Sequence, residues 1–137
     1  MRKRTKAREL TLKFLYQIDI TKEELSIAVD QFWQEQSAST QIKEFAQQLI
    51  QGTLKHLAKI DNTVTAYAEN WQLKRMAVID RNILRLATFE LLFLEDIPPK
   101  VTINEAVELA KRYGDVESGK FVNGILDKIN KEETVKS

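Results

Sequence analysis

The stretch M-A-V-I-D-R-N-I-L-R-L-A-T-F-E-L-L-F-L-E, residues 76–95, is the most hydrophobic segment of this chain of 137 residues. Its apolar side chains recur every three or four residues, which is typical of a helix rather than of a strand. They cover so wide an arc that we expect other helices to pack on several sides of it. Residues 76–95 therefore predict a central helix.

Two carboxylates lie on the apolar arc of this helix, Asp80 and Glu90. Burying a carboxylate is costly unless a cation or hydrogen-bond donors accompany it. Glu90 lies deep in the helix, so we expect it to form an internal ion pair. Asp80 lies near the start, beside Arg81 and Arg85, which leaves a role in recognition and a structural role equally open.

The rest of the chain shows the same helical spacing almost throughout, with only four glycines and two prolines. Pro98-Pro99 ends the central helix, because proline lacks the backbone donor. Thr21 with Glu24 and Thr102 with Glu105 match the T-x-x-E capping box that begins many helices. The pattern predicts an all-α fold of about seven helices, which begin near residues 3, 21, 40, 60, 76, 102 and 118, followed by a charged tail from Lys131.

Composition excludes several classes of protein. There is no cysteine and only one histidine, His56, so we expect no disulfide, no metal site and no cofactor. The apolar runs are shorter than a membrane span, and no apolar signal segment follows the basic N-terminus, which favours the cytoplasm. Gly114, Gly119 and Lys120 resemble a phosphate loop, but Phe121 stands where a serine or threonine is required. We expect no enzyme.

Five cations stand within the first eight residues, namely Arg2, Lys3, Arg4, Lys6 and Arg8. The net charge of the chain is +1, so residues 9–137 carry −4 once these five are set aside. Because the segment already belongs to an amphipathic helix, the guanidinium groups of Arg4 and Arg8 should be held in fixed geometry, which suits phosphate. This basic arm favours nucleic-acid binding; the alternative is a solvated tail that only aids solubility.

Two further features leave a choice open. Leu12 and Tyr16 lie opposite the main apolar stripe of the first helix, so either a partner or another helix of the same domain covers them. Gly124 lies inside the last helix, where glycine costs about 1 kcal/mol relative to alanine. Close helix packing or the approach of an RNA strand to the edge formed by residues 121–123 would each explain it.

Three ordered blocks resemble the NusB family of bacterial transcription antitermination factors. They are R-K-R-T-K-A-R-E-L-T-L-K-F-L-Y-Q at 2–17, D-R-N-I-L-R-L-A-T-F-E-L at 80–91, and P-x-K-V-T-I-N-E-A-V-E-L-A-K-R-Y-G followed by K-F-V-N-G-I-L-D at 98–127. The similarity spans nearly the whole chain. It implies one all-helical domain built from two small packed bundles, roughly residues 1–72 and 73–131. It also implies a non-catalytic adaptor.

The resemblance further implies partners and sites. The partners would be the boxA element of nascent ribosomal RNA, ribosomal protein NusE and the elongating RNA polymerase, with a homodimer left open. RNA would contact the basic arm and a second zone on the last helix, in all Arg2, Lys3, Arg4, Lys6, Arg8, Lys120, Phe121 and Asn123, although Phe121 could remain in the core. NusE would contact Tyr16, Asp80, Arg85, Leu12 and Glu117. The main alternative is a protein-interaction module whose surface of Leu12, Tyr16 and Asp80 binds another protein, the basic arm being incidental.

Overall fold

The computed structural model describes residues 2–134, and all of the regular structure in that range is helical. Seven α-helices and a short 3₁₀ turn follow one another: α1 (Lys3–Thr21), α2 (Leu25–Glu35), α3 (Thr40–Lys55), α4 (Leu57–Tyr67), η1 (Leu73–Arg75), α5 (Val78–Phe93), α6 (Pro99–Tyr113) and α7 (Ser118–Glu133). The all-α prediction is therefore confirmed. The tail predicted from Lys131 begins later, because residues 131–133 form the last turn of α7; residues 135–137 lie outside the described part of the chain.

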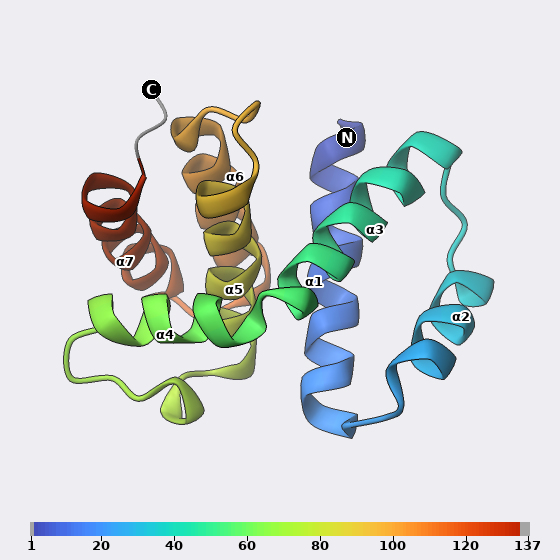
Figure 1. The fold of residues 1–137 in the computed structure, drawn as a ribbon, viewed down its shortest axis with the longest axis horizontal. Helices are drawn as coiled ribbons and strands as arrows, with labels where there is room; N and C mark the ends of the chain where they lie inside the picture. The colour runs from blue at the N-terminus through green and yellow to red at the C-terminus, as the bar shows by residue number, and fades with distance from the viewer. Residues whose placement is uncertain (1, 135–137) are drawn as a thin grey trace.

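The helices form two groups, α1 to α3 and α4 to α7, which Figure 1 shows side by side. Helix α5 packs against α1, α3, α4, α6 and α7, as expected for the hydrophobic segment that forms it. Helix α4 packs on α5 and α7, and so belongs with the second group. A division of the chain near residue 72 stays a prediction.

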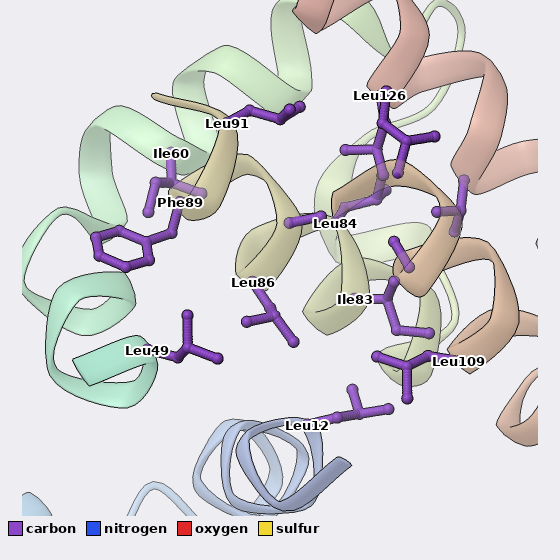
Figure 2. Close-up of a cluster of buried hydrophobic side chains, with 14 of the residues drawn as sticks. Leu12, Leu49, Ile60, Ile83, Leu84, Leu86, Phe89, Leu91, Leu109 and Leu126 are labelled. Carbon is purple, nitrogen blue, oxygen red and sulfur yellow. The ribbon is translucent and has the colours of Figure 1, made fainter. Parts of the chain in front are cut away.

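One main core runs through both groups (Figure 2). Leu49 of α3, Leu86 of α5 and Leu126 of α7 all belong to it, and so does Leu12 of α1. A smaller cluster under α2 takes the other side of α1, through Leu10, Phe14, Ala28, Phe32 and Ile50. Helix α1 is thus buried on two faces, and Leu12 is covered by helices of its own domain rather than left for a partner.

Several helix ends differ from the prediction. Thr21 is the last residue of α1 rather than the cap of α2; the side chain of Glu24 caps α2 instead, accepting bonds from the backbone N–H groups of Ser26 and Ile27. Helix α6 begins at Pro99, because proline is well tolerated in the first helical turn. Thr102 and Glu105 therefore lie inside α6, where their side chains serve other contacts described below.

Candidate nucleic-acid and partner interface

The basic arm begins α1 and lies along α3. Arg2 precedes the helix, and Arg2, Lys3 and Arg4 are exposed. Lys3 Nζ donates a hydrogen bond to Gln41 Oε1, and the Arg4 guanidinium carbon lies 4.4 Å from the centroid of the Phe45 ring. The cation–π contact restricts Arg4 while leaving its donors open to solvent. These positive groups are therefore fixed on a folded surface.

Arg8, the fifth basic residue, does not lie on that surface. Its side chain is only 4% exposed. Nε and Nη2 donate to the two carboxylate oxygens of Glu90 at 2.8 and 2.7 Å, and Nη1 donates to Glu105 Oε1 at 3.1 Å. The internal ion pair expected for Glu90 is confirmed, and its cation is Arg8. The expectation that Arg8 presents a fork to phosphate is wrong for this structure, because carboxylates of α5 and α6 occupy that fork.

Glu9 joins the arm to the end of α6. The Nζ atom of Lys6 lies 4.0 Å from Glu9 Oε1. Arg112 Nη1 and the Tyr113 hydroxyl both donate to Glu9 Oε2, the hydroxyl at 2.7 Å. The Glu9 carboxylate is thus neutralised, and it ties the last turn of α6 to the helix that carries the arm.

The second predicted RNA zone lies on α7. Lys120 and Asn123 are exposed and line a hollow of about 500 Å³ together with Lys111 of α6. Phe121 is half-buried against the main core, and its ring meets Trp71 edge-on with the centroids 5.6 Å apart. Phe121 therefore packs against the core, while part of its ring stays exposed to solvent.

Tyr16 is 39% exposed and lies in a groove of about 380 Å³ between α1 and the end of α6. Lys13 and Tyr113 border the same groove, and Leu12 contributes to its lining while buried in the core. The phenol of Tyr16 is thus available to a partner. Leu12 forms the buried floor of the groove beneath Tyr16 and is not part of an open apolar patch.

Asp80 is 8% exposed and sits in the first turn of α5. Burial raises the pKa of its carboxyl, the charge of Asp115 adds to the rise, and a hydrogen bond with Ser118 opposes it. The buried Oδ1 atom has no hydrogen-bond partner among the described residues. The negative charge of Asp80 is therefore poorly compensated by the groups around it.

Arg85 points elsewhere. It lies five residues after Asp80, which turns it about 140° around the helix. Its Nε and Nη2 atoms donate to Asp61 at 2.8 and 3.0 Å, and Nη1 donates to Asp19 at 3.1 Å. Glu117 is exposed just before α7. The residues predicted to contact NusE are therefore not gathered on one open surface.

Gly124 faces open space: a Cβ added there would meet no heavy atom within 4 Å. Close packing within the chain is therefore not the reason for a glycine at this position. The exposed backbone of α7 at Gly124 adjoins Asn123, in the zone predicted for RNA.

The sequence prediction missed Lys13, Lys111, Arg112 and Tyr113 as surface groups of this region. Lys111 and Arg112 form a basic pair in the last turn of α6. A basic pair followed by a tyrosine, 46% exposed here, is also the composition of a nucleic-acid surface.

Residues 2–134 contain neither a cluster of metal ligands nor a helix suited to a membrane. No group of three or more His, Asp or Glu side chains there is arranged to hold a metal ion. None of the described helices is both long enough and apolar enough to traverse a bilayer.

Comparison with known proteins agrees with these features. The model of the NusB family matches residues 5–131. The transcription antitermination protein NusB of Thermodesulfovibrio yellowstonii is 45% identical over 141 residues, covering 96% of this chain and 93% of that protein. The NusB protein of Desulfitobacterium hafniense is 50% identical over 125 residues, covering 90% of this chain and 84% of that one.

Solved structures of NusB proteins have the same fold. NusB of T. maritima superimposes with a TM-score of 0.89 at 45% identity, covering 97% of this chain and 94% of that one. A complex of the antitermination factors NusB and NusE with double-stranded RNA contains a chain that matches with a TM-score of 0.86 at 31% identity, covering 96% of this chain and 98% of that one. By sequence and by fold, this chain belongs to the NusB family.

Proposed function

We propose that this protein is a transcription antitermination factor that acts as a non-catalytic RNA-binding adaptor. Together with ribosomal protein NusE it binds the boxA element of nascent ribosomal RNA transcripts and supports processive transcription by RNA polymerase in the cytoplasm. The observation that carries the proposal is the membership of the chain in the NusB family over residues 5–131, combined with a basic arm fixed on α1.

The RNA contacts begin at the arm. Arg2, Lys3, Arg4 and Lys6 supply positive charge along one end of α1, and the contact with Phe45 restricts Arg4. Cations of this kind position phosphates, whereas base edges supply sequence specificity. Arg8 contributes indirectly, because its pairing with Glu90 and Glu105 anchors the first turns of α1 to α5 and α6.

A second RNA zone on α7 completes the contact. Lys120 adds a cation, Asn123 adds an amide that pairs with base edges, and the exposed part of Phe121 offers a stacking surface. Glu9, held by Arg112 and Tyr113, ties the last turn of α6 to the helix that carries the arm, and α7 packs on α6. Two fixed zones bind one strand better than a single flexible tail does.

NusE contacts the groove and the helix ends near it. Tyr16 presents its phenol there, Glu117 stands exposed at the start of α7, and Asp80 offers a carboxylate that its own fold leaves without full compensation. Leu12 acts by supporting Tyr16. Arg85 acts by holding the end of α1 through Asp19.

A gel-shift measurement with a short boxA RNA, with and without purified NusE, tests the proposal. We expect weak retention by the protein alone and a lower apparent Kd when NusE is added. Arg4→Ala should reduce RNA retention while the protein stays folded. If the Arg4→Ala variant keeps its complex with NusE while neither the variant nor the wild type retains the RNA, the arm is incidental and the protein is a protein-interaction module instead.

A further inference from the structure

A second basic hollow lies at the other end of α1 from the arm. It has a volume of about 410 Å³ and is bounded by the end of α1, the turn η1 and the start of α5. Lys22, Lys74, Arg81 and Arg85 line it, with the single carboxylate of Asp19. Because a helix rises 1.5 Å per residue, the 19 residues of α1 make it about 28 Å long, with the arm at its start and the hollow at its end. Figure 1 shows the N-terminus and the far end of α1 at opposite edges of the molecule.

Two carboxylates orient the arginines of this hollow. Asp19 Oδ2 accepts from Arg81 Nε at 2.6 Å and from Arg85 Nη1 at 3.1 Å, and Asp61 binds the opposite edge of Arg85. Burial alone would raise the pKa of Asp19, but the hydrogen bonds from Arg81 and Asn82 and the charges of the two arginines hold it well below its usual range. Asp19 is therefore ionised at neutral pH and fixes the guanidinium groups.

The two lysines are not needed for this network. Arg81 and Arg85 already balance Asp19 and Asp61, two cations against two anions. Within residues 2–134 no carboxylate forms an ion pair with Lys74, and Lys22 Nζ donates to Asp19 Oδ1 at 3.4 Å although its side chain is 76% exposed. The two lysines thus leave the hollow with an excess of two positive charges.

The backbone places the lysines as well. Lys22 caps the C-terminus of α1 with φ at 58°, a left-handed conformation that few residues other than glycine adopt. Lys74 lies in η1, and the carbonyl of Lys74 accepts a bond from Arg81 Nη1 at 3.5 Å. The Nη2 atom of Arg81 has no acceptor within the described protein. Donors from three separate elements therefore border one small space.

We propose that this hollow binds a phosphate group, with Lys22, Lys74 and Arg81 as its ligands and Asp19 as the residue that positions Arg81. The excess of two positive charges matches a phosphate monoester, which carries about −1.5 to −2 at neutral pH. Gln72 lines the hollow and adds an amide donor. The site is distinct from the arm and does not depend on the RNA function proposed above.

NMR titration of the full-length, isotope-labelled protein with inorganic phosphate tests the site, with sodium chloride at matched ionic strength as the reference. We expect saturable shifts confined to the backbone amides around Lys22, Lys74 and Arg81. Lys74→Gln and Lys22→Gln should each weaken phosphate binding about tenfold, the loss of one charge-assisted contact. Lys100→Gln removes an exposed lysine of α6 outside the hollow and should bind phosphate like the wild type.

Two further measurements separate this site from the arm and identify the source of the phosphate. The Arg4→Ala variant should retain the phosphate shifts even where it loses RNA. Competition with an RNA oligomer that carries a 5′-monophosphate, against the same oligomer without it, shows whether the phosphate belongs to RNA or to a small molecule.

The proposal is overturned if the shifts follow ionic strength alone, or if both lysine variants bind phosphate as the wild type does. It is equally overturned if an acidic peptide produces saturable shifts of the amides around Lys22, Lys74 and Arg81 while phosphate does not. Thermal unfolding provides the folding control: Lys22 and Lys74 are exposed, and Asp19 keeps Arg81 and Arg85 when either lysine is replaced, so both variants should keep the wild-type midpoint to within a few degrees.

Discussion

Arg8 and Glu90 lie 82 positions apart in the chain and form a buried, two-pronged ion pair, with Nε to Oε2 at 2.8 Å and Nη2 to Oε1 at 2.7 Å. Thr102 Oγ1 donates to Glu90 Oε1 at 2.9 Å, and Glu105 accepts from both Arg8 and Thr5. The pair therefore links the helix that carries the basic arm to α5 and α6. It fixes where the arm stands relative to the second bundle.

Arg8→Met should lower the free energy of unfolding by about 3–5 kcal/mol, because it leaves the charge of Glu90 buried without its cation. The double variant Arg8→Met/Glu90→Met should recover most of the loss, since no fully buried charge is left unpaired; Glu105 also loses Arg8, but its side chain is 24% exposed and keeps the bond from Thr5. Urea denaturation of the two single variants and the double variant measures this coupling. Additive losses in the double variant would contradict the account of the pair.

Gly124→Ala should raise the free energy of unfolding by about 1 kcal/mol, because alanine is the better helix former and its Cβ meets open space. If RNA or NusE approaches the α7 backbone closely, the same variant binds that partner less tightly in spite of its greater stability. Thermal unfolding together with the gel-shift measurement tests both effects. An unchanged affinity would remove Gly124 from the binding surface.

Binding of boxA RNA should weaken with salt, with log affinity falling against log salt at a slope of roughly −2 to −4 if three to five phosphates are neutralised. Lys3→Ala and Arg4→Ala should each flatten that slope by about 0.7, because each removes one phosphate contact. Lys55→Ala serves as the matched control, because Lys55 is an exposed lysine in the last turn of α3, whereas the arm lies against the first turns of that helix. A slope that does not depend on the arm variants would assign the salt effect to other residues.

Asp19 should make stability fall in acid. Its folded pKa is depressed, so its contribution is fully present above the unfolded pKa of about 3.8 and is lost as the pH falls from there toward the folded value. Asp19→Asn should therefore be less stable than the wild type at pH 7, and the gap should narrow below about pH 4. Urea midpoints measured from pH 2.5 to 7 test the sign. If the difference in stability between the wild type and Asp19→Asn did not change with pH, the charge of the Asp19 carboxylate would not be what stabilises the fold.

Asp80 should act in the opposite direction. Its folded pKa is raised by burial, so the folded state is most favoured below the unfolded pKa and loses stability as the pH rises through the folded pKa. Asp80→Asn should be more stable than the wild type at pH 7, with a gap that closes in acid. If the carboxylate contacts NusE, the variant should also bind NusE more weakly, which a titration with purified NusE measures. Equal stability at pH 7 would show that Ser118 compensates the buried charge.

The sequence predicted the positions of the helices better than their first residues. The spacing of apolar residues predicted the central position of residues 76–95, because a wide apolar arc requires neighbours on several sides wherever they come from. Pro98-Pro99 marked the break before α6, because proline acts through the local backbone. The capping boxes failed, because Glu24 and Pro99 provided other local starts for α2 and α6.

Local patterns in the chain were enough to predict the helices, the face of each helix on which a residue lies, the need of Glu90 for a cation, and the basic arm. Long-range packing, by contrast, makes Arg8 that cation, gives Asp80 and Arg85 different neighbours, and requires Gly52 where the Phe89 ring would lie 2.0 Å from a Cβ. Helical periodicity fixes directions within one helix. Which distant helix covers a given face follows from the packing of the whole chain, and no local pattern records it.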